Sequence, residues 1–205
     1  MRTRKVLGYG FFAVLIALVF SACFSFPEPA PAAPKAPPPL KIGSIGPGGG
    51  KIFYISTAGF TVQMLDPEEN YTAHYLEIAH GIEGSAWLGV GRPHAWSNGQ
   101  TDIAGTEAAI GTGRKNTALI LAADPSAPAA KVCYEFSNNG FTDWFLASVD
   151  ETREIERNAV VLGMGTGGFL WTSTQDNSRN ALNLGMRLEG VRKSTTSTVW
   201  PIRAF

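Results

Sequence analysis

A run of prolines and alanines divides the chain and confines its folded part to the residues that follow. Residues 24–40 contain seven prolines and four alanines in seventeen positions. Proline has no amide hydrogen and a fixed φ angle, so such a stretch forms neither helix nor sheet and favours polyproline II. At 3.1 Å per residue it spans about 50 Å. The sequence therefore predicts a spacer followed by one domain over residues 41–205; a proline-rich ligand for a partner protein is the alternative.

Residues 1–22 have the organisation of a signal peptide. Arg2, Arg4 and Lys5 are basic, and residues 6–20 are almost entirely apolar. An apolar stretch of this length is too short to cross a bilayer comfortably as a helix. The segment therefore predicts export.

The segment ends at Cys23 in a sequence that resembles the lipobox of bacterial lipoproteins. Ser21 and Ala22 are small, although Phe20 replaces the usual aliphatic residue. The resemblance implies cleavage before Cys23 and acyl chains, such as palmitate, on its thiol and amine, which together give stable membrane anchoring. The residue after the cysteine is Phe24 and not an aspartate, which resembles lipoproteins sent to an outer membrane. We therefore expect a domain that faces the periplasm or the cell surface. A plain secretory signal with an unmodified Cys23 is the alternative.

Charge and cysteine content limit the function of the exported part. Without its signal peptide the chain carries a net charge of about −3, which does not predict nucleic-acid binding. If Cys23 is acylated, Cys133 has no cysteine partner in the chain, so the domain must be held by its core without an internal disulfide. The apolar neighbours of Cys133 predict a buried thiol.

Two glycine-rich segments resemble nucleotide-binding loops by letter only. Residues 46–50 precede Lys51, but Ile52 replaces the Ser or Thr of a phosphate-binding loop, and a strand is expected where that loop needs a helix. Residues 163–168 match the dinucleotide fingerprint, but they follow a predicted helix and precede a predicted strand, the reverse of the required order. Neither segment predicts a nucleotide site.

Periodicity predicts a mixture of strands and helices after the spacer. Residues 51–56 and 60–65 alternate and predict a hairpin. Asn116 is expected to cap a helix that ends near Ala123. Ser148 and Glu151 have capping-box spacing and predict a second helix that reaches Leu162. Further strands are predicted over residues 75–79, 169–174, 181–188 and 199–204, with polar turns over 175–180 and 189–197. Residues 97–102, which follow Trp96 and the nearby Trp87, predict a long polar loop of the kind that carries function.

Several of these motifs, taken in order, resemble the Lcl-type C-terminal domain family. The resemblance covers residues 41–205, and the chain departs from the family pattern at Ala147 and Trp200. The motifs that carry it are residues 46–54, 102–106, 109–113, 139–146, 171–174 and 201–205.

The family resemblance implies an α+β fold similar to C-type lectins and formylglycine-generating enzymes. It implies two helices packed on a twisted, mostly antiparallel sheet with long loops. The namesake domain is the ligand-binding end of an adhesin that recognises sulfated glycosaminoglycans. The chain lacks the calcium signature of C-type lectins, and the domain lacks the cysteine pair of formylglycine-generating enzymes.

Five basic residues against two acidic ones make the C-terminal segment locally positive. Arginine suits sulfate and carboxylate groups, and exposed aromatic faces suit sugar rings. The alternative is that the tryptophans are core and the arginines are scattered over the surface. The candidate ligand-binding residues are Trp171, Asp176, Arg179, Arg187, Arg192, Lys193, Trp200 and Arg203.

We therefore expect a lipid-anchored envelope protein with a non-catalytic domain, an adhesin for a sulfated glycan or a matrix protein. His74, His80 and His94 lack a compact metal-ligand spacing, so we expect no metal or cofactor. A structural envelope protein with cell-wall or self contacts, or an enzyme of the formylglycine-generating fold group, are the alternatives. The oligomeric state is left open.

Overall fold

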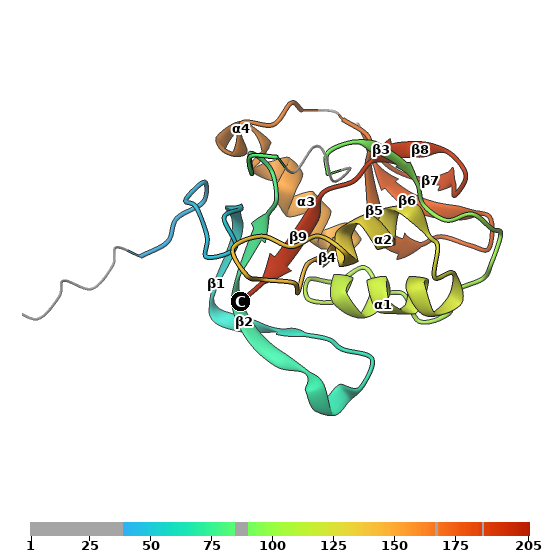
Figure 1. The fold of residues 1–205 in the computed structure, drawn as a ribbon, viewed down its shortest axis with the longest axis horizontal. Helices are drawn as coiled ribbons and strands as arrows, with labels where there is room; N and C mark the ends of the chain where they lie inside the picture. The colour runs from blue at the N-terminus through green and yellow to red at the C-terminus, as the bar shows by residue number, and fades with distance from the viewer. Residues whose placement is uncertain (1–38, 85–89, 167, 186) are drawn as a thin grey trace, which may run out of the picture. The chain divides into compact units, whose positions relative to one another are not determined.

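Strands from distant parts of the chain form two sheets (Figure 1). The computed structural model describes residues 39–84, 90–166, 168–185 and 187–205. The predicted signal peptide, Cys23, the linker up to residue 38 and Trp87 lie outside the described residues. The described residues belong to one compact unit, residues 38–205, which contains its own hydrophobic core.

The first sheet joins the beginning of the domain to its end. Its strands are β1 (Lys51–Val62), β2 (Tyr71–Ile78), β9 (Pro201–Ala204) and β4 (Phe145–Leu146), in that spatial order. All neighbours are antiparallel. The short 3₁₀ helix η1 (Pro67–Glu69) connects β1 to β2. The C-terminal strand β9 therefore lies inside the sheet, between β2 and β4.

The second sheet comes mainly from the C-terminal third. Its order is β3 (Pro93–Ala95), β8 (Thr196–Thr198), β5 (Leu170–Gln175), β6 (Asn180–Leu184) and β7 (Leu188–Arg192). The pairs are antiparallel except β5 with β8, which is parallel. The turn between β5 and β6 and the turn after β7 lie at the same end of this sheet, where the Lys193 amide bonds to the Arg179 carbonyl oxygen.

In the described residues, four α-helices pack against these sheets. Helices α1 (Gly113–Ala123) and α2 (Pro128–Tyr134) lie side by side and contact β4 (Figure 1). Helix α3 (Val149–Arg157) contacts β1 of the first sheet and β5 and β6 of the second, and the short α4 (Ala159–Leu162) follows it. In the described part of the chain, no helix combines the length and apolar character needed to cross a membrane.

The α+β class predicted from the sequence is confirmed, but the predicted element count is wrong. Two helices on one sheet were expected, whereas the described residues form four helices and two sheets. Helix α2 escaped prediction because it has only seven residues and starts with Pro128, which is tolerated in the first turn. Helix α4 is separated from α3 by Asn158, where the predicted single helix breaks.

The predicted hairpin between residues 51–56 and 60–65 is wrong. Residues 51–56 and 60–62 belong to the same strand β1, and both parts pair with β2. The register slips between Ile55 and Phe60, where Gly59 has a φ of 82° and the Ser56 hydroxyl donates to the Gly59 carbonyl over 3.1 Å. A bulge with turn-like sequence therefore resembled a hairpin turn, because the local pattern does not reveal which strand is the partner.

Three further boundaries differ from prediction for tertiary reasons. Asn116 does not cap α1, because it is buried inside that helix. Its side-chain amide forms hydrogen bonds with the Glu107 backbone and with the Ser173 hydroxyl. The predicted strand 181–188 is two strands, because the chain reverses between Gly185 and Arg187. The predicted turn 189–197 contains most of β7 and part of β8.

The capping box that begins α3 is confirmed. The Ser148 hydroxyl accepts from the Glu151 amide, and the Glu151 carboxylate accepts from the Ser148 amide over 2.6 Å. Glu151 is fully buried and also accepts from the Gly111 amide over 2.8 Å. Burial raises the pKa of the Glu151 carboxyl from 4.5 to about 7, and the backbone donors only partly oppose this rise.

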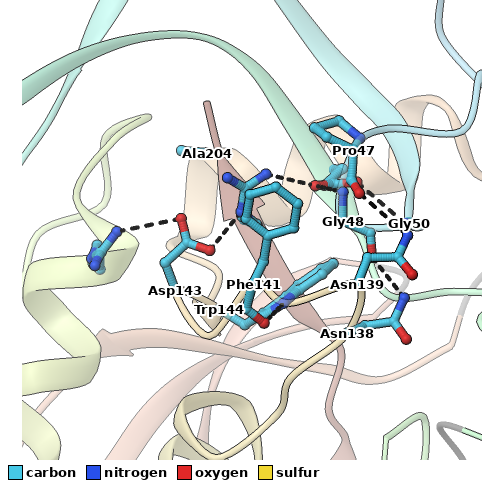
Figure 2. A network of polar contacts seen from close by, with 12 residues as sticks. Pro47, Gly48, Gly50, Asn138, Asn139, Phe141, Asp143, Trp144 and Ala204 are labelled. Atoms are coloured by element: carbon cyan, nitrogen blue, oxygen red, sulfur yellow. Dashed lines mark hydrogen bonds and ion pairs between the residues drawn. The ribbon is translucent and has the colours of Figure 1, made fainter.

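The glycine-rich segment before β1 binds a carboxylate of the protein itself. The amides of Gly48 and Gly50 donate to the two oxygens of Glu77, over 2.9 and 3.2 Å (Figure 2). A Cβ atom on Gly48 would lie 2.5 Å from the Glu77 carboxylate, and one on Gly50 would lie 2.5 Å from the Ile78 carbonyl oxygen. These two glycines are therefore required by the close approach of the loop to β2, and a strand follows the loop as predicted.

Arg203 completes this network from β9. Its guanidinium donates to Glu77 over 3.0 Å and to Asp143 over 2.5 Å, and it lies 3.8 Å from the ring centre of Phe141 (Figure 2). Glu77 is fully buried, so burial raises the pKa of its carboxyl, while Arg203 and the two glycine amides act in the opposite direction. The network therefore joins three of the sequence motifs: residues 46–54, 139–146 and 201–205.

The raised pKa of Glu151 predicts that acid stabilises the domain. A folded-state pKa above the unfolded value means that the folded protein holds the proton more tightly. This contribution is fully present below pH 4.5 and is lost as the pH rises through about 7. For a shift of this size it amounts to about 3 kcal/mol.

Urea unfolding of residues 38–205 at pH 4 and pH 8 measures this effect. The stability difference between the wild type and Glu151→Gln should shrink by about 3 kcal/mol as the pH rises. Glu156→Gln, at an exposed position of the same helix, is the matched control and should show no such change. A Glu151→Gln difference that is independent of pH would contradict the assignment.

Candidate functional site: a basic cleft

Three loops at one end of the second sheet enclose a polar cleft. The loop after β3, the β5–β6 turn and the β7–β8 turn contribute its walls, and its volume is about 470 Å³. Three of the predicted ligand-binding residues lie in it together. The lining residues are Ser97, Asn98, Gly99, Gln100, Arg179, Asn180, Arg192, Lys193 and Ser194.

Hydrogen bonds hold the loop after β3 in place. The Trp96 amide donates to the Lys193 carbonyl oxygen over 2.8 Å. The Asn98 amide donates to Asp124 over 3.0 Å, and the Asn98 side chain donates to Ser126 over 3.0 Å. The loop is therefore attached both to the second sheet and to the connection between α1 and α2.

The two turns that carry the arginines are also fixed through the backbone. The side-chain oxygen of Asn177 accepts from the amides of Arg179 and Asn180, over 2.9 and 3.0 Å. The Lys193 amide donates to the Arg179 carbonyl oxygen over 3.0 Å. This bond between the two turns fixes the backbone at Arg179 beside that at Lys193.

Lys193 lines the cleft, but its ammonium group is held in the protein interior. The residue is only 2% exposed, and its Nζ donates to the Thr101 carbonyl oxygen and to Gln175 Oε1, both over 2.6 Å. The Nζ atom also lies 4.7 Å from the ring centre of Trp96. Burial lowers the pKa of Lys193, and Asp102 partly opposes this shift. The groups around this ammonium, on Thr101, Gln175 and Trp96, belong to residues that do not line the cleft.

Arg179 and Arg192 supply two exposed cations. Neither guanidinium has a hydrogen bond or an ion pair with another described residue, and no carboxylate lines the cleft. Two exposed positive charges without a lining carboxylate create a positive potential. Guanidinium groups bind carboxylates and tetrahedral oxyanions in a bidentate manner. The arrangement is suited to a sulfate or carboxylate group on a polar ligand.

The structure places the other predicted site residues elsewhere. Arg187 is exposed at the opposite end of β7, 3.9 Å from Glu189. Arg203 is buried in the network with Glu77. Asp176 is exposed beside Gly190, outside the cleft lining. These three charged side chains do not contribute to the basic cleft.

The tryptophans are divided between the core and a different surface. Trp96, Trp144 and Trp171 are at most 2% exposed, and Trp171 donates its ring N–H to the His94 carbonyl oxygen over 2.8 Å. Trp200 is half-buried against His80, with the ring centres 4.9 Å apart, and does not line the cleft. The cleft therefore offers charge and hydrogen bonds without an exposed indole face.

The polar lining residues of the cleft were not singled out from the sequence. They are Ser97, Asn98, Gln100, Asn180 and Ser194. The signal that could have found the first three was present, since residues 97–102 were predicted to form a functional loop. Asn180 and Ser194 carry no local signal, because they reach the cleft only through the turn before β6 and the turn after β7.

The remaining groups with catalytic or metal-binding chemistry are dispersed. Within the described ranges, no three His, Cys, Asp or Glu side chains meet in a way that could hold a metal ion. Burial raises the pKa of Cys133 well above its usual value, so its thiol is a poor nucleophile at neutral pH. Burial also lowers the pKa of His80.

Comparisons with known proteins do not identify the chain. No protein-family model matches it, and no curated protein matches it significantly.

Proposed function

We propose that this protein is a lipid-anchored protein of the bacterial cell envelope with a non-catalytic binding domain at residues 41–205. The domain is an adhesin-type module with a C-type-lectin-like fold, and it belongs with the Lcl-type C-terminal domains. Its ligand is a sulfated glycan, or a matrix component that carries such a glycan. The basic cleft with Arg179, Arg192 and Lys193 is the observation that carries this proposal.

The chemistry of the cleft supports an anionic saccharide over an apolar ligand. Its lining combines cations with hydroxyl and amide groups, which are suited to sulfate esters and sugar hydroxyls. Two of the cations are unpaired guanidinium groups, so binding a sulfate does not require an existing ion pair to break. Hydrogen bonds fix the backbone of the two turns before the ligand arrives, which reduces the entropic cost of binding.

The anchor follows from the N-terminal sequence. A signal peptide, a relaxed lipobox at Cys23 and a proline-rich spacer are the arrangement expected of a domain held away from a lipid surface. The surface of an outer membrane suits a protein that binds external glycans.

Glycan binding by residues 38–205 at low and high salt tests the proposal. Sulfated chains should bind and neutral chains should not, and the affinity should fall as salt rises. Arg192→Ala and Arg179→Ala should each weaken binding roughly tenfold, because each removes a charge-assisted contact.

Arg187→Ala is the matched control, because Arg187 is an exposed arginine of the same segment outside the cleft. It should leave the affinity almost unchanged. An absence of binding across sulfated glycans and matrix proteins would rule out the adhesin. Equal losses in Arg187→Ala and Arg192→Ala would show that binding depends on net charge and not on the cleft.

Fatty-acid labelling of the full chain in a bacterial host tests the anchor. The wild type should incorporate label, and Cys23→Ser should not, because it lacks the thiol that is acylated. Cys133→Ala should label normally, since Cys133 is buried in the domain. Labelling that persists in Cys23→Ser would refute the lipobox assignment.

A further inference from the structure

A second cleft lies between the end of β1, helices α1 and α2, and the loop before β4. Its volume is about 260 Å³, and it shares no lining residue with the basic cleft. Its character is different, because Met64, Leu65, Tyr134 and Trp144 contribute mainly apolar surface. Concave, mostly apolar sites with a few polar groups are the usual form of small-molecule sites.

Two side chains on the walls of this cleft are unusually exposed for their type. Leu65 is 54% exposed and Tyr134 is 62% exposed, although both are large and hydrophobic. The buried Trp144 also lines the cleft. An aromatic or branched aliphatic group bound here would cover the exposed faces of Leu65 and Tyr134, which gives such a ligand a favourable hydrophobic contribution.

Arg114 supplies a cation with unused donors to the same cleft. Its Nη1 donates to the Tyr71 hydroxyl over 3.2 Å and lies 3.9 Å from Asp143 Oδ2. Its other guanidinium nitrogens have no hydrogen-bond partner among the described residues, and its side chain is 28% exposed. These free N–H groups can bind a carboxylate, for which the guanidinium geometry is well matched.

Two carboxylates also line the cleft, and one of them, Asp143, forms an ion pair with Arg114 that is longer than a hydrogen bond. Asp143 is bound more closely by Arg203, whose Nε lies 2.5 Å from Oδ1 and which also pairs with Glu77, so the ion pair with Arg114 leaves the other guanidinium nitrogens of Arg114 free. Glu69 is exposed to solvent, where water and salt screen its charge. The cleft therefore combines apolar walls with one available cation.

We propose that this cleft binds a small organic carboxylate with one aromatic ring or a short branched aliphatic group. The apolar part lies between Leu65 and Tyr134, and the carboxylate bonds Arg114. This site shares no residue with the basic cleft, and its ligand is a small, partly apolar carboxylate instead of a sulfated glycan.

Titration of residues 38–205 with 3-phenylpropionate, followed by amide chemical shifts in NMR, tests this site. The acid should bind saturably, with shifts centred on residues 64–65, 114–118 and 142–145. The neutral 3-phenyl-1-propanol should bind at least tenfold more weakly, because it lacks the carboxylate that Arg114 binds. Arg114→Gln should abolish this preference, while Lys115→Gln on the same helix should keep it.

The walls are tested in the same way. Tyr134→Ala should weaken binding of the acid at least fivefold, and Phe169→Ala, at an equally exposed aromatic position outside the cleft, should not. Since Tyr134 is exposed, its replacement should leave the fold intact, which a thermal melt checks. Equal affinity for the acid and the alcohol in the wild type, unchanged binding in Tyr134→Ala, or no saturation would overturn the proposal.

Discussion

The buried ion pair between Arg203 and Glu77 is the interaction on which the rest of the domain depends. It joins the C-terminal strand β9 to β2, and the same carboxylate holds the loop at Gly48 and Gly50. Through Asp143, the arginine also fixes the loop before β4. A buried charge without its partner is strongly destabilising. The separate ends of the domain are therefore held together by one charge network.

This arrangement divides the basic residues of the C-terminal segment into two groups. Arg203 has two carboxylate partners and is 6% exposed, so its charge is neutralised by groups of the protein itself. Arg179 and Arg192 lie on turns of the second sheet and are exposed, with no described partner. Lys193 lies between these cases, because it is buried but bonded only to neutral oxygen atoms. The distinction between structural and ligand-facing charge therefore rests on counter-ions and burial.

Sequence patterns predicted what depends on local spacing. The capping box at Ser148 and Glu151, the polar loop over residues 97–102 and the positive C-terminal segment were all recognised. The strand that follows the glycine-rich loop was predicted, but the internal ligand of the loop, Glu77, was not found. The two segments are more than 25 residues apart, and nothing in the local sequence pairs them.

The prediction failed where partners are chosen by tertiary contacts. The bulge at Gly59 has the residues of a hairpin turn, and only the presence of β2 determines that the chain continues as one strand. For the same reason Arg203 and Arg187 looked equivalent to Arg192. Their difference depends on which carboxylates the fold brings near them, and this information is not local.

A double-mutant cycle on Glu77 and Arg203 tests the central role of the buried pair most directly. The free energy of unfolding of residues 38–205 would be measured in urea for Glu77→Gln, Arg203→Met and the double variant. Each single change should cost roughly 3–5 kcal/mol, and the double variant should cost at least about 2 kcal/mol less than the sum of the two. The exposed pair Asp150 and Arg153 provides the control cycle, with an expected coupling of no more than about 0.5 kcal/mol. A Glu77–Arg203 coupling as small as that of the control pair would contradict the account.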